Sequence, residues 1–211
     1  MPTLRLMAAT AALAMASAAP LAAQRSTEAN DAKLRANCRL AAQVLETGHP
    51  STHYEWAVNE IRRCEQIAGP ALAAHWSALR EADRADLKQL MFSSSSMRDQ
   101  RIFDAVLSVA GSRDVAPIIR LAALSVLVSY ADPVLDVSLE RLEKPKENEL
   151  LGHVTHFAPS EGAVPLAAGD LPALMSLLRT LAEQEPDPQV AAAARYLLRG
   201  FEARGVAVSP S

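Results

Sequence analysis

The stretch Ile118-Ile-Arg-Leu-Ala-Ala-Leu-Ser-Val-Leu-Val128 decides the fold class of this 211-residue chain. Its apolar residues would cover almost the whole circumference of a helix, with only Arg120 and Ser125 between them. A helix that is apolar all round is buried between neighbouring elements rather than lying on a surface. The sequence therefore predicts a helix over 115–130 that is enclosed by other helices.

Helical patterns flank this stretch on both sides, and capping residues mark their starts. Asp187-Pro188 and Asp132-Pro133 each place a capping acid before a proline at the first helical position. Thr52-His-Tyr-Glu55 forms a capping box, and Ser96-Met-Arg-Asp99 is a shorter variant. The serine run 93–96 is typical of a linker. The predicted helices are 28–46, 52–67, 70–80, 84–92, 98–110, 115–130, 133–142, 171–184 and 188–201.

Composition favours helix over sheet. Alanine and leucine dominate the chain, and aromatic residues make up only 4% of it. Trp56 and Trp76 stand at helical spacings typical of core positions. We therefore expect an all-α fold with both tryptophans in its core. One core-facing stripe is formed by Leu171, Leu174, Met175, Leu178, Leu181 and Ala182.

Two of the predicted helices carry similar residue types at the same offsets. The stretch Asp187-Pro-Gln-Val-Ala-Ala-Ala-Ala-Arg-Tyr-Leu-Leu198 opens with Asp and carries Val, Ala and Leu at offsets 3, 7 and 11. It resembles the second helix of a HEAT-like repeat. Ile119-Arg-Leu-Ala-Ala-Leu-Ser-Val-Leu127 is similar in the same frame, although Ala116 stands where the opening acid is expected. Each follows an amphipathic helix, at 98–110 and at 171–184.

This resemblance implies an architecture for the chain. It implies antiparallel helix pairs stacked as a short HEAT-like α-solenoid over 97–201, interrupted by an irregular insertion near 143–169. The preceding segment 24–96 reads as N-terminal helix pairs that match the repeat poorly, and 202–211 reads as a tail. A generic helical bundle is the alternative.

Residues 1–23 follow the pattern of a secretory signal peptide: a positive charge, an apolar run and then small residues. Arg5 supplies a positive charge, Leu6–Ala16 is an apolar run, and small residues follow. The run is shorter than the roughly 20 residues that a membrane-spanning helix needs. Cleavage is expected after Ala23, with a cut after Ala18 as the second choice and an uncleaved anchor helix as the alternative.

Export of the chain bears on its two cysteines, Cys38 and Cys64. The periplasm and the extracellular space permit disulfides, and an even number of cysteines is consistent with a bridge. Both cysteines lie on apolar helical faces, and two antiparallel helices joined near 47–52 would bring those faces together. We therefore predict a Cys38–Cys64 disulfide, with two buried free thiols as the alternative.

The charge of the chain argues against nucleic acid as a partner. The formal net charge is −3, and no basic cluster is present. Nucleic-acid binding depends largely on cationic contacts with phosphates, so we expect no nucleic-acid partner. We also expect no membrane span after signal cleavage. By analogy with helical-repeat proteins, the expected partner is another protein or a peptide.

Catalytic motifs are absent from the sequence. It contains no phosphate loop, no G-x-S-x-G turn and no H-E-x-x-H. The leading hypothesis is therefore a non-enzymatic interaction scaffold with no catalytic residues, no metal and no cofactor. The alternative is a metal-dependent binder or hydrolase that uses His153 and His156 in the 143–169 insertion. Glu149 and Glu161 stand close to this histidine pair in the sequence, and imidazole with carboxylate is a common ligand set for divalent metals.

Overall fold

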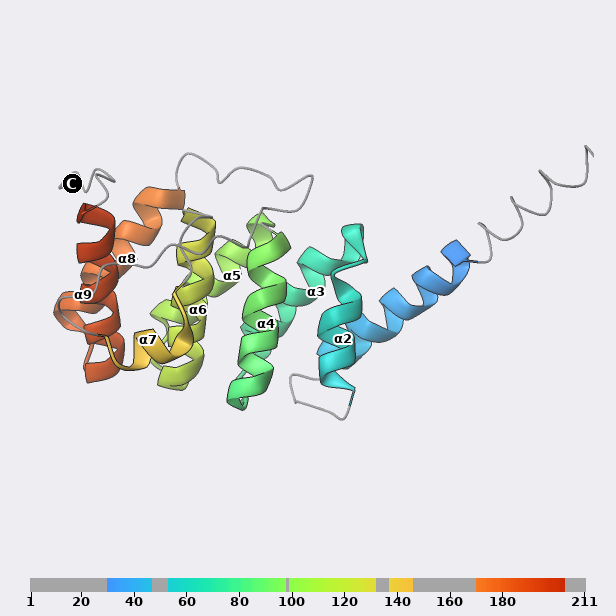
Figure 1. Cartoon of the computed structure of the whole chain (residues 1–211), viewed down its shortest axis with the longest axis horizontal. Coiled ribbons are helices and arrows are strands. Elements are labelled where there is room, and N and C mark those ends of the chain that lie inside the picture. Colours follow the sequence, from blue (N-terminus) through green and yellow to red (C-terminus); the bar gives the residue numbers. More distant parts are fainter. Residues whose placement is uncertain (1–29, 47–52, 98, 132–136, 146–169, 204–211) are drawn as a thin grey trace, which may run out of the picture.

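The computed structural model describes residues 30–46, 53–97, 99–131, 137–145 and 170–203 (Figure 1). All regular structure in these residues is helical, which confirms the predicted all-α class. The predicted signal peptide, the tail after residue 203 and most of the 143–169 insertion lie outside the described residues. After a first helix over 30–46, the elements are α2 (Tyr54–Ile61), α3 (Glu65–Ala78), α4 (Arg84–Met97), α5 (Gln100–Gly111), α6 (Pro117–Ala131), α7 (Leu139–Glu143), α8 (Asp170–Gln184) and α9 (Pro188–Ala203).

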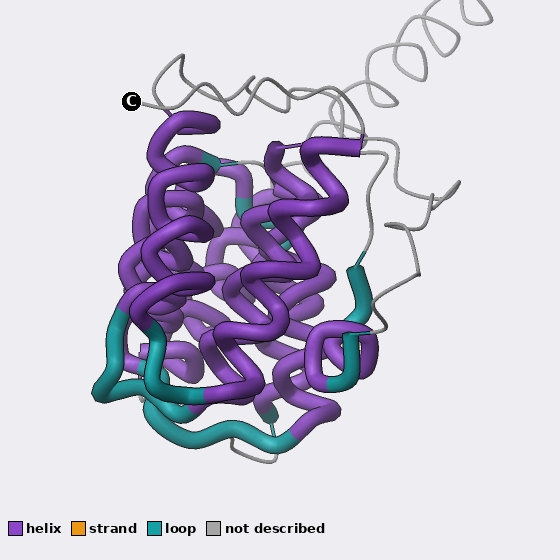
Figure 2. Tube along the Cα trace, turned by 90° about the vertical axis from the view of Figure 1, so that its left-hand side faces the viewer, coloured by secondary structure: helices purple, strands orange, loops and turns teal. Residues whose placement is uncertain are grey.

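The helices stack in two layers. α3, α5 and α8 contact one another in sequence in one layer, and α2, α4, α6 and α9 do so in the other. The short α7 packs against α6 and α9. Seen from the α8–α9 end, the helices overlie one another in these two layers (Figure 2). The chain alternates between layers from helix to helix, which is a helical-repeat arrangement.

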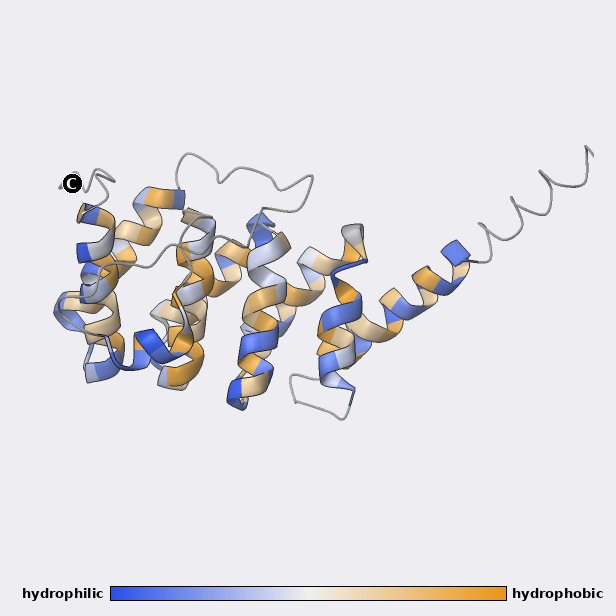
Figure 3. Cartoon of the chain, in the orientation of Figure 1, coloured by the Kyte–Doolittle hydropathy of each residue, from blue (hydrophilic) through white to orange (hydrophobic). Residues whose placement is uncertain are grey.

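The helix predicted to be enclosed is α6, and this prediction is confirmed. It packs against α4, α5, α7 and α9, and every residue from Ile119 to Val128 is buried. Figure 3 shows hydrophobic colour on most turns of α6. Burying this many apolar side chains stabilises the fold by about 1.5–3 kcal/mol for each large one. Contacts on all sides explain why the sequence of α6 has no polar face.

The predicted serine linker is wrong, because residues 93–96 lie in the last turns of α4. The Ser93 hydroxyl donates to the Val58 carbonyl at 3.2 Å, and the Trp76 indole donates to the Ser94 hydroxyl at 2.8 Å. Both serines are fully buried. Serine disfavours helix interiors because its hydroxyl competes for backbone groups. Here the hydroxyls bond to α2 and α3 instead, so tertiary contacts override the local preference.

Two other predicted boundaries are corrected. α2 ends at Ile61, and α3 begins at Glu65 and continues through Pro70, so the break expected at 68–69 lies several residues earlier. Residues 137 and 138 are not helical, and α7 begins only at Leu139. The Ser138 side chain caps α7 by accepting from the Arg141 amide, a signal that the proline-based prediction of 133–142 missed.

Of the predicted caps, one is confirmed, one is wrong, and the others lie outside the described residues. The Asp187 carboxylate accepts from the amides of Gln189 and Val190 at 3.0 Å, so this predicted cap is confirmed. The cap of α5 is Asp99, which accepts from the Arg101 amide at 2.9 Å, and not Ser96. α2 begins after His53, whose side chain makes no capping bond, and Thr52 lies outside the described residues.

Candidate functional site

Cys38 and Cys64 are brought together as predicted. Their sulfur atoms lie 2.08 Å apart, at disulfide distance, and join the first helix to the start of α3. Both cysteines are buried in the same apolar cluster. This bridge ties the first helix to the N-terminal end of the stack.

The histidines named by the metal hypothesis, His153 and His156, lie outside the described residues, as do Glu149 and Glu161. Within the described part of the chain, no three or more His, Cys, Asp or Glu side chains are grouped so that they could hold a metal ion. The hypothesis based on the 143–169 insertion therefore stays a prediction.

A buried histidine that the sequence did not single out lies in the N-terminal half. The Nδ1 atom of His75 on α3 is 2.7 Å from the Leu45 carbonyl, and its Nε2 atom is 3.0 Å from the Tyr54 hydroxyl. The carbonyl can only accept, so Nδ1 carries the proton and the Tyr54 hydroxyl donates to Nε2. Desolvation lowers the pKa of His75, against the opposing effect of the Leu45 carbonyl, and raises the pKa of Tyr54. Both ring nitrogens are engaged, so this group joins three helices.

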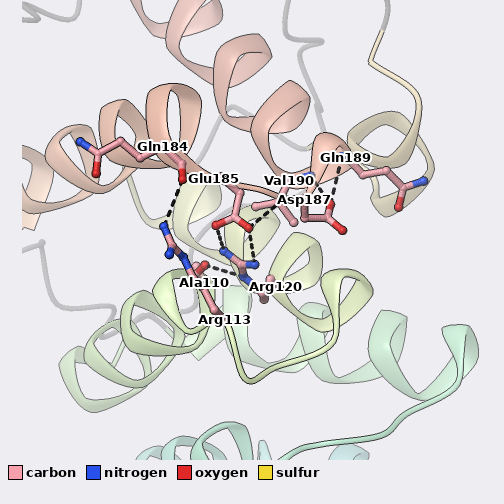
Figure 4. Close-up of polar contacts among 8 residues, drawn as sticks. All are labelled: Ala110, Arg113, Arg120, Gln184, Glu185, Asp187, Gln189 and Val190. Carbon is pink, nitrogen blue, oxygen red and sulfur yellow. Dashed lines mark hydrogen bonds and ion pairs between the residues drawn. The ribbon is translucent and has the colours of Figure 1, made fainter.

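A second buried polar group joins the two C-terminal helix pairs (Figure 4). The Arg120 guanidinium on α6 contacts both carboxylate oxygens of Glu185, at 3.0 and 2.5 Å, and its Nε donates to the Ala110 carbonyl at 3.1 Å. Glu185 also accepts from the Asp187 amide at 3.1 Å. The hydrogen bonds from Arg120 hold the pKa of Glu185 below its ordinary value. The arrangement leaves neither charge open to a ligand, so its role is to hold the helices together.

Large apolar side chains are exposed in the N-terminal half of the described chain. Trp56 was predicted to be in the core with Trp76, and this is wrong for Trp56: it is 37% exposed, whereas Trp76 is fully buried. Phe92 on α4 is 36% exposed. Helical spacing alone cannot distinguish a face that meets another helix from a face that meets solvent. The four exposed large apolar residues are Leu40, Trp56, Ile67 and Phe92.

Where α2 and α4 lie in contact, three pairs of side chains follow one another along the two helices. Arg62, which caps the C-terminal end of α2, places its guanidinium 4.3 Å from the centre of the Phe92 ring. One turn earlier, the Gln89 amide nitrogen donates to the Asn59 side-chain oxygen. At the start of both helices, Glu55 lies close enough to Asp86 to raise its pKa, although desolvation is the larger cause. We refer to Glu55, Asp86, Asn59, Gln89, Arg62 and Phe92 as the α2–α4 strip.

The α2–α4 strip holds an arginine that is stacked on an aromatic ring. Partial burial lowers the pKa of Arg62, and no ion pair to its guanidinium occurs among the side chains that the structure describes. By contrast, two cations of α4 are paired with α7: Arg84 with Glu143 and Lys88 with Glu140, both at 2.5 Å. An arginine stacked on an aromatic ring is held in place with its donors still directed to solvent. Trp56 borders the strip, three residues before Asn59 on the same helix.

The sequence contained little signal for this strip. Asn59 and Gln89 are ordinary surface residues in an amphipathic helix, and they become a pair only because α2 and α4 lie in contact. Arg62 and Phe92 likewise become a pair only because α2 and α4 lie in contact.

No described helix is both long and apolar enough to cross a bilayer. Comparison of the chain with protein-family models, with curated proteins and with solved structures finds no significant match.

Proposed function

We propose that this chain is an exported, non-enzymatic helical-repeat protein of the HEAT-like type that binds another protein or peptide through its α2–α4 strip. The observation that carries the proposal is the Arg62–Phe92 stack: an arginine without an ion-pair partner among the described side chains, held on an exposed aromatic ring. Arginine and aromatic residues contribute disproportionately to binding energy in protein interfaces.

Three further features support this proposal. The two-layered stack presents α2 and α4 side by side, which makes a continuous surface from separate helices. The exposed Trp56 lies beside the strip and adds a second aromatic side chain. The disulfide and the buried His75 group hold the first helix, α2 and α3 together, so the strip rests on a rigid support.

The proposal is tested by capturing partners from the exported protein fraction of the native source. Wild type, Phe92→Ala and Arg62→Gln are compared with two matched controls, Ile67→Ala on α3 and Arg199→Gln on α9. Both control side chains are exposed and lie outside the strip. We expect a partner whose recovery falls about tenfold or more with either strip variant and changes little with the controls.

Two results would contradict the proposal. Reproducible recovery of no partner by the wild-type chain would contradict the binding function. Equal recovery by the wild type and both strip variants would contradict the location of the site. Circular dichroism and thermal unfolding of each variant establish that lost recovery is not lost folding.

A further inference from the structure

The short helix α7 lies against α6 and α9 and reaches α4 through two ion pairs (Figure 1). It has five residues, and an isolated helix of that length is not stable in water. Its helical conformation therefore depends on the surface that it covers. The ion pairs of α7 involve no residue of the α2–α4 strip, so this surface is a separate one.

The apolar side of α7 is buried. In the described segment 137–145, the buried side chains are Val137, Leu139 and Leu142. Ser125 marks the part of α6 that this segment covers, because its hydroxyl donates to the Val137 carbonyl at 2.5 Å. A serine inside a helix commonly bonds to a carbonyl of its own preceding turn. Here the hydroxyl is directed to another segment, so the apolar floor under α7 contains one donor for a main-chain carbonyl.

Two cations of α4 pair with the acidic residues of α7. Arg84 contacts both carboxylate oxygens of Glu143, at 2.6 and 2.5 Å, and Lys88 lies 2.5 Å from a carboxylate oxygen of Glu140. Arg84 and Lys88 are one turn apart on α4, so they project from the same side of it. The side chains of Arg84, Lys88 and Glu140 are more than half exposed. Such pairs add little stability, but they favour an acidic segment over a basic one.

The sequence of α7 shows what kind of segment fits this surface. Its two leucines stand three residues apart, and an acidic residue directly follows each of them. Ser138 precedes the first leucine and caps the helix by accepting from the Arg141 amide. Amphipathic helices that dock in apolar grooves use anchors at this spacing. The fitting segment is therefore a capped helix with two leucine–acid pairs.

α7 is held less firmly than the helix beneath it. Three of the nine residues 137–145 are buried, whereas α6 is buried without a break from Ile119 to Val128. Salt screens ion pairs with exposed partners. Segments with few buried apolar contacts open at a lower free-energy cost than the core of a protein. Opening of α7 uncovers an apolar surface beside two cations.

We propose that the surface of α4, α6 and α9 under α7 is a second docking site, which α7 occupies within the chain and which a capped, acidic amphipathic helix of a partner protein occupies when α7 opens. The partner's two apolar anchors lie on α6 and α9, and its two carboxylates pair with Arg84 and Lys88. One of its main-chain carbonyls accepts from Ser125. α7 is then an internal competitor with a high effective concentration, which keeps weaker helices out of the site.

The test measures the binding of fluorescently labelled peptides to the full chain by anisotropy. The α7 peptide comprises residues 137–145 with an acetylated start and an amidated end, which removes the terminal charges. A pattern peptide keeps the serine cap, both leucines and both glutamates and has alanine at the other positions. Two control peptides carry Leu139→Ser/Leu142→Ser or Glu140→Lys/Glu143→Lys.

Weakening α7 in the chain should open the site. Leu139→Ala/Leu142→Ala removes both buried anchors, and we call this variant the released chain. We expect the released chain to bind the α7 peptide and the pattern peptide saturably. The wild type should bind each at least about tenfold more weakly, because its own α7 competes. The peptide with serine in place of both leucines should also lose about tenfold or more in affinity for the released chain.

Charge reversal locates the site. In the released chain, Arg84→Glu/Lys88→Glu should weaken the α7 peptide by about tenfold or more and make the lysine-substituted peptide the tighter binder. Arg35→Glu/Arg39→Glu is the matched control, since these two arginines are exposed on the first helix and have the same spacing. It should leave the order of the peptides unchanged.

Three results would overturn the inference. The first is the absence of saturable binding of the α7 peptide up to about 1 mM by a folded released chain. The second is an unchanged charge preference after Arg84→Glu/Lys88→Glu. The third is binding of the α7 peptide without binding of the pattern peptide, which would assign the site to a second copy of this chain instead of a partner helix.

Circular dichroism and thermal unfolding show whether the released chain folds. If it does not, Glu140→Lys/Glu143→Lys replaces it, because this variant keeps both leucines and repels α7 from Arg84 and Lys88. Native-state hydrogen exchange of the wild type needs no variant. The hydrogen-bonded amides of α7 should exchange through an opening that leaves α3 and α5 protected. Exchange of these amides only on unfolding of the whole chain would overturn the inference.

Discussion

Arg120 on α6 and Glu185 in the loop between α8 and α9 form a buried ion pair across the two C-terminal helix pairs, with side chains only 2% and 1% exposed. Sixty-five residues separate them in the sequence, including the segment that connects α7 to α8. The pair therefore fixes how α8 and α9 pack against α6 whatever that connecting segment does. Buried ion pairs add little net stability over apolar packing, but removing one partner leaves an uncompensated charge in the core.

The first prediction concerns this ion pair. Glu185→Gln keeps the size of the side chain but leaves the Arg120 charge buried and unpaired, and we expect the free energy of unfolding to fall by about 3–5 kcal/mol. Urea denaturation measures this change. Glu183→Gln, at an exposed position on α8, is the control and should stay within about 0.5 kcal/mol of the wild type. Equal effects of the two substitutions would show that the pair does not hold the helices together.

The second prediction concerns the pH dependence that His75 produces. Its pKa in the folded chain is lowered by burial, so the unfolded chain binds more protons as the pH falls below the ordinary value of about 6.5. The free energy of unfolding should therefore decrease on acidification, by up to about 1.4 kcal/mol per pH unit between pH 6.5 and the folded-state pKa, and His75 should contribute nothing to the slope above about pH 7.5.

Urea denaturation at several pH values between 5 and 7.5 measures this slope. His75→Gln removes the titrating group and should be less pH-dependent than the wild type over this range. If His75→Gln keeps the wild-type slope, the decrease in stability comes from other groups.

The third prediction concerns the Cys38–Cys64 disulfide. The intact mass of the purified chain should rise by about 2 Da on reduction. The bridge closes a loop with a sequence separation of 26, so the Cys38→Ala/Cys64→Ala variant should lose about 3–4 kcal/mol of unfolding free energy if chain entropy dominates. A mass that reductant leaves unchanged would contradict the bridge in the purified protein.

The fourth prediction concerns the close approach of α3 to the start of α5. A Cβ atom at Gly69 would overlap the carboxylate of Asp99, which caps α5 and is held by Arg101. Alanine normally stabilises a helix interior over glycine by about 1 kcal/mol. We expect the opposite sign for Gly69→Ala, a loss of about 1–3 kcal/mol from overpacking.

Thermal or urea unfolding checks the sign of this effect. Gly111→Ala is a milder comparison, because its Cβ would meet only the flexible end of the Leu177 side chain, at 3.3 Å. In a chain that already carries Asp99→Ala, Gly69→Ala should cost less than it does in the wild type, because the overlapping carboxylate is gone. A stabilising Gly69→Ala would show that the approach of the two helices is looser than the structure has it.

Local patterns in the sequence were sufficient for the helical class and for several contacts. The apolar circumference of α6 predicted an enclosed helix, because only burial on all sides can accommodate such a surface in water. Asp187 was predicted as a cap because a capping acid bonds to amides only two and three residues away. The pairing of Cys38 and Cys64 followed from two adjacent helices and there being only two cysteines.

Packing between helices determines which surface positions face a neighbour and which face solvent. Trp56 and Trp76 have similar helical spacing, yet one is exposed and the other is enclosed and bonded to Ser94. The serines at the end of α4 stay helical because α2 and α3 provide partners for their hydroxyls. Periodicity identifies an apolar face but does not identify what covers it.

The candidate site shows most clearly the difference between what local sequence patterns predict and what depends on packing. Each residue of the α2–α4 strip looks like an ordinary solvent-facing position in its own helix. The stacking of Arg62 on Phe92 and the bond between Gln89 and Asn59 exist because two helices that are not consecutive in the chain lie in contact. The helices of this chain could be predicted from local patterns, because helix formation and capping are local. The choice of neighbours, and with it the arrangement of the α2–α4 strip, depends on packing between distant segments, so it is seen only in the folded stack.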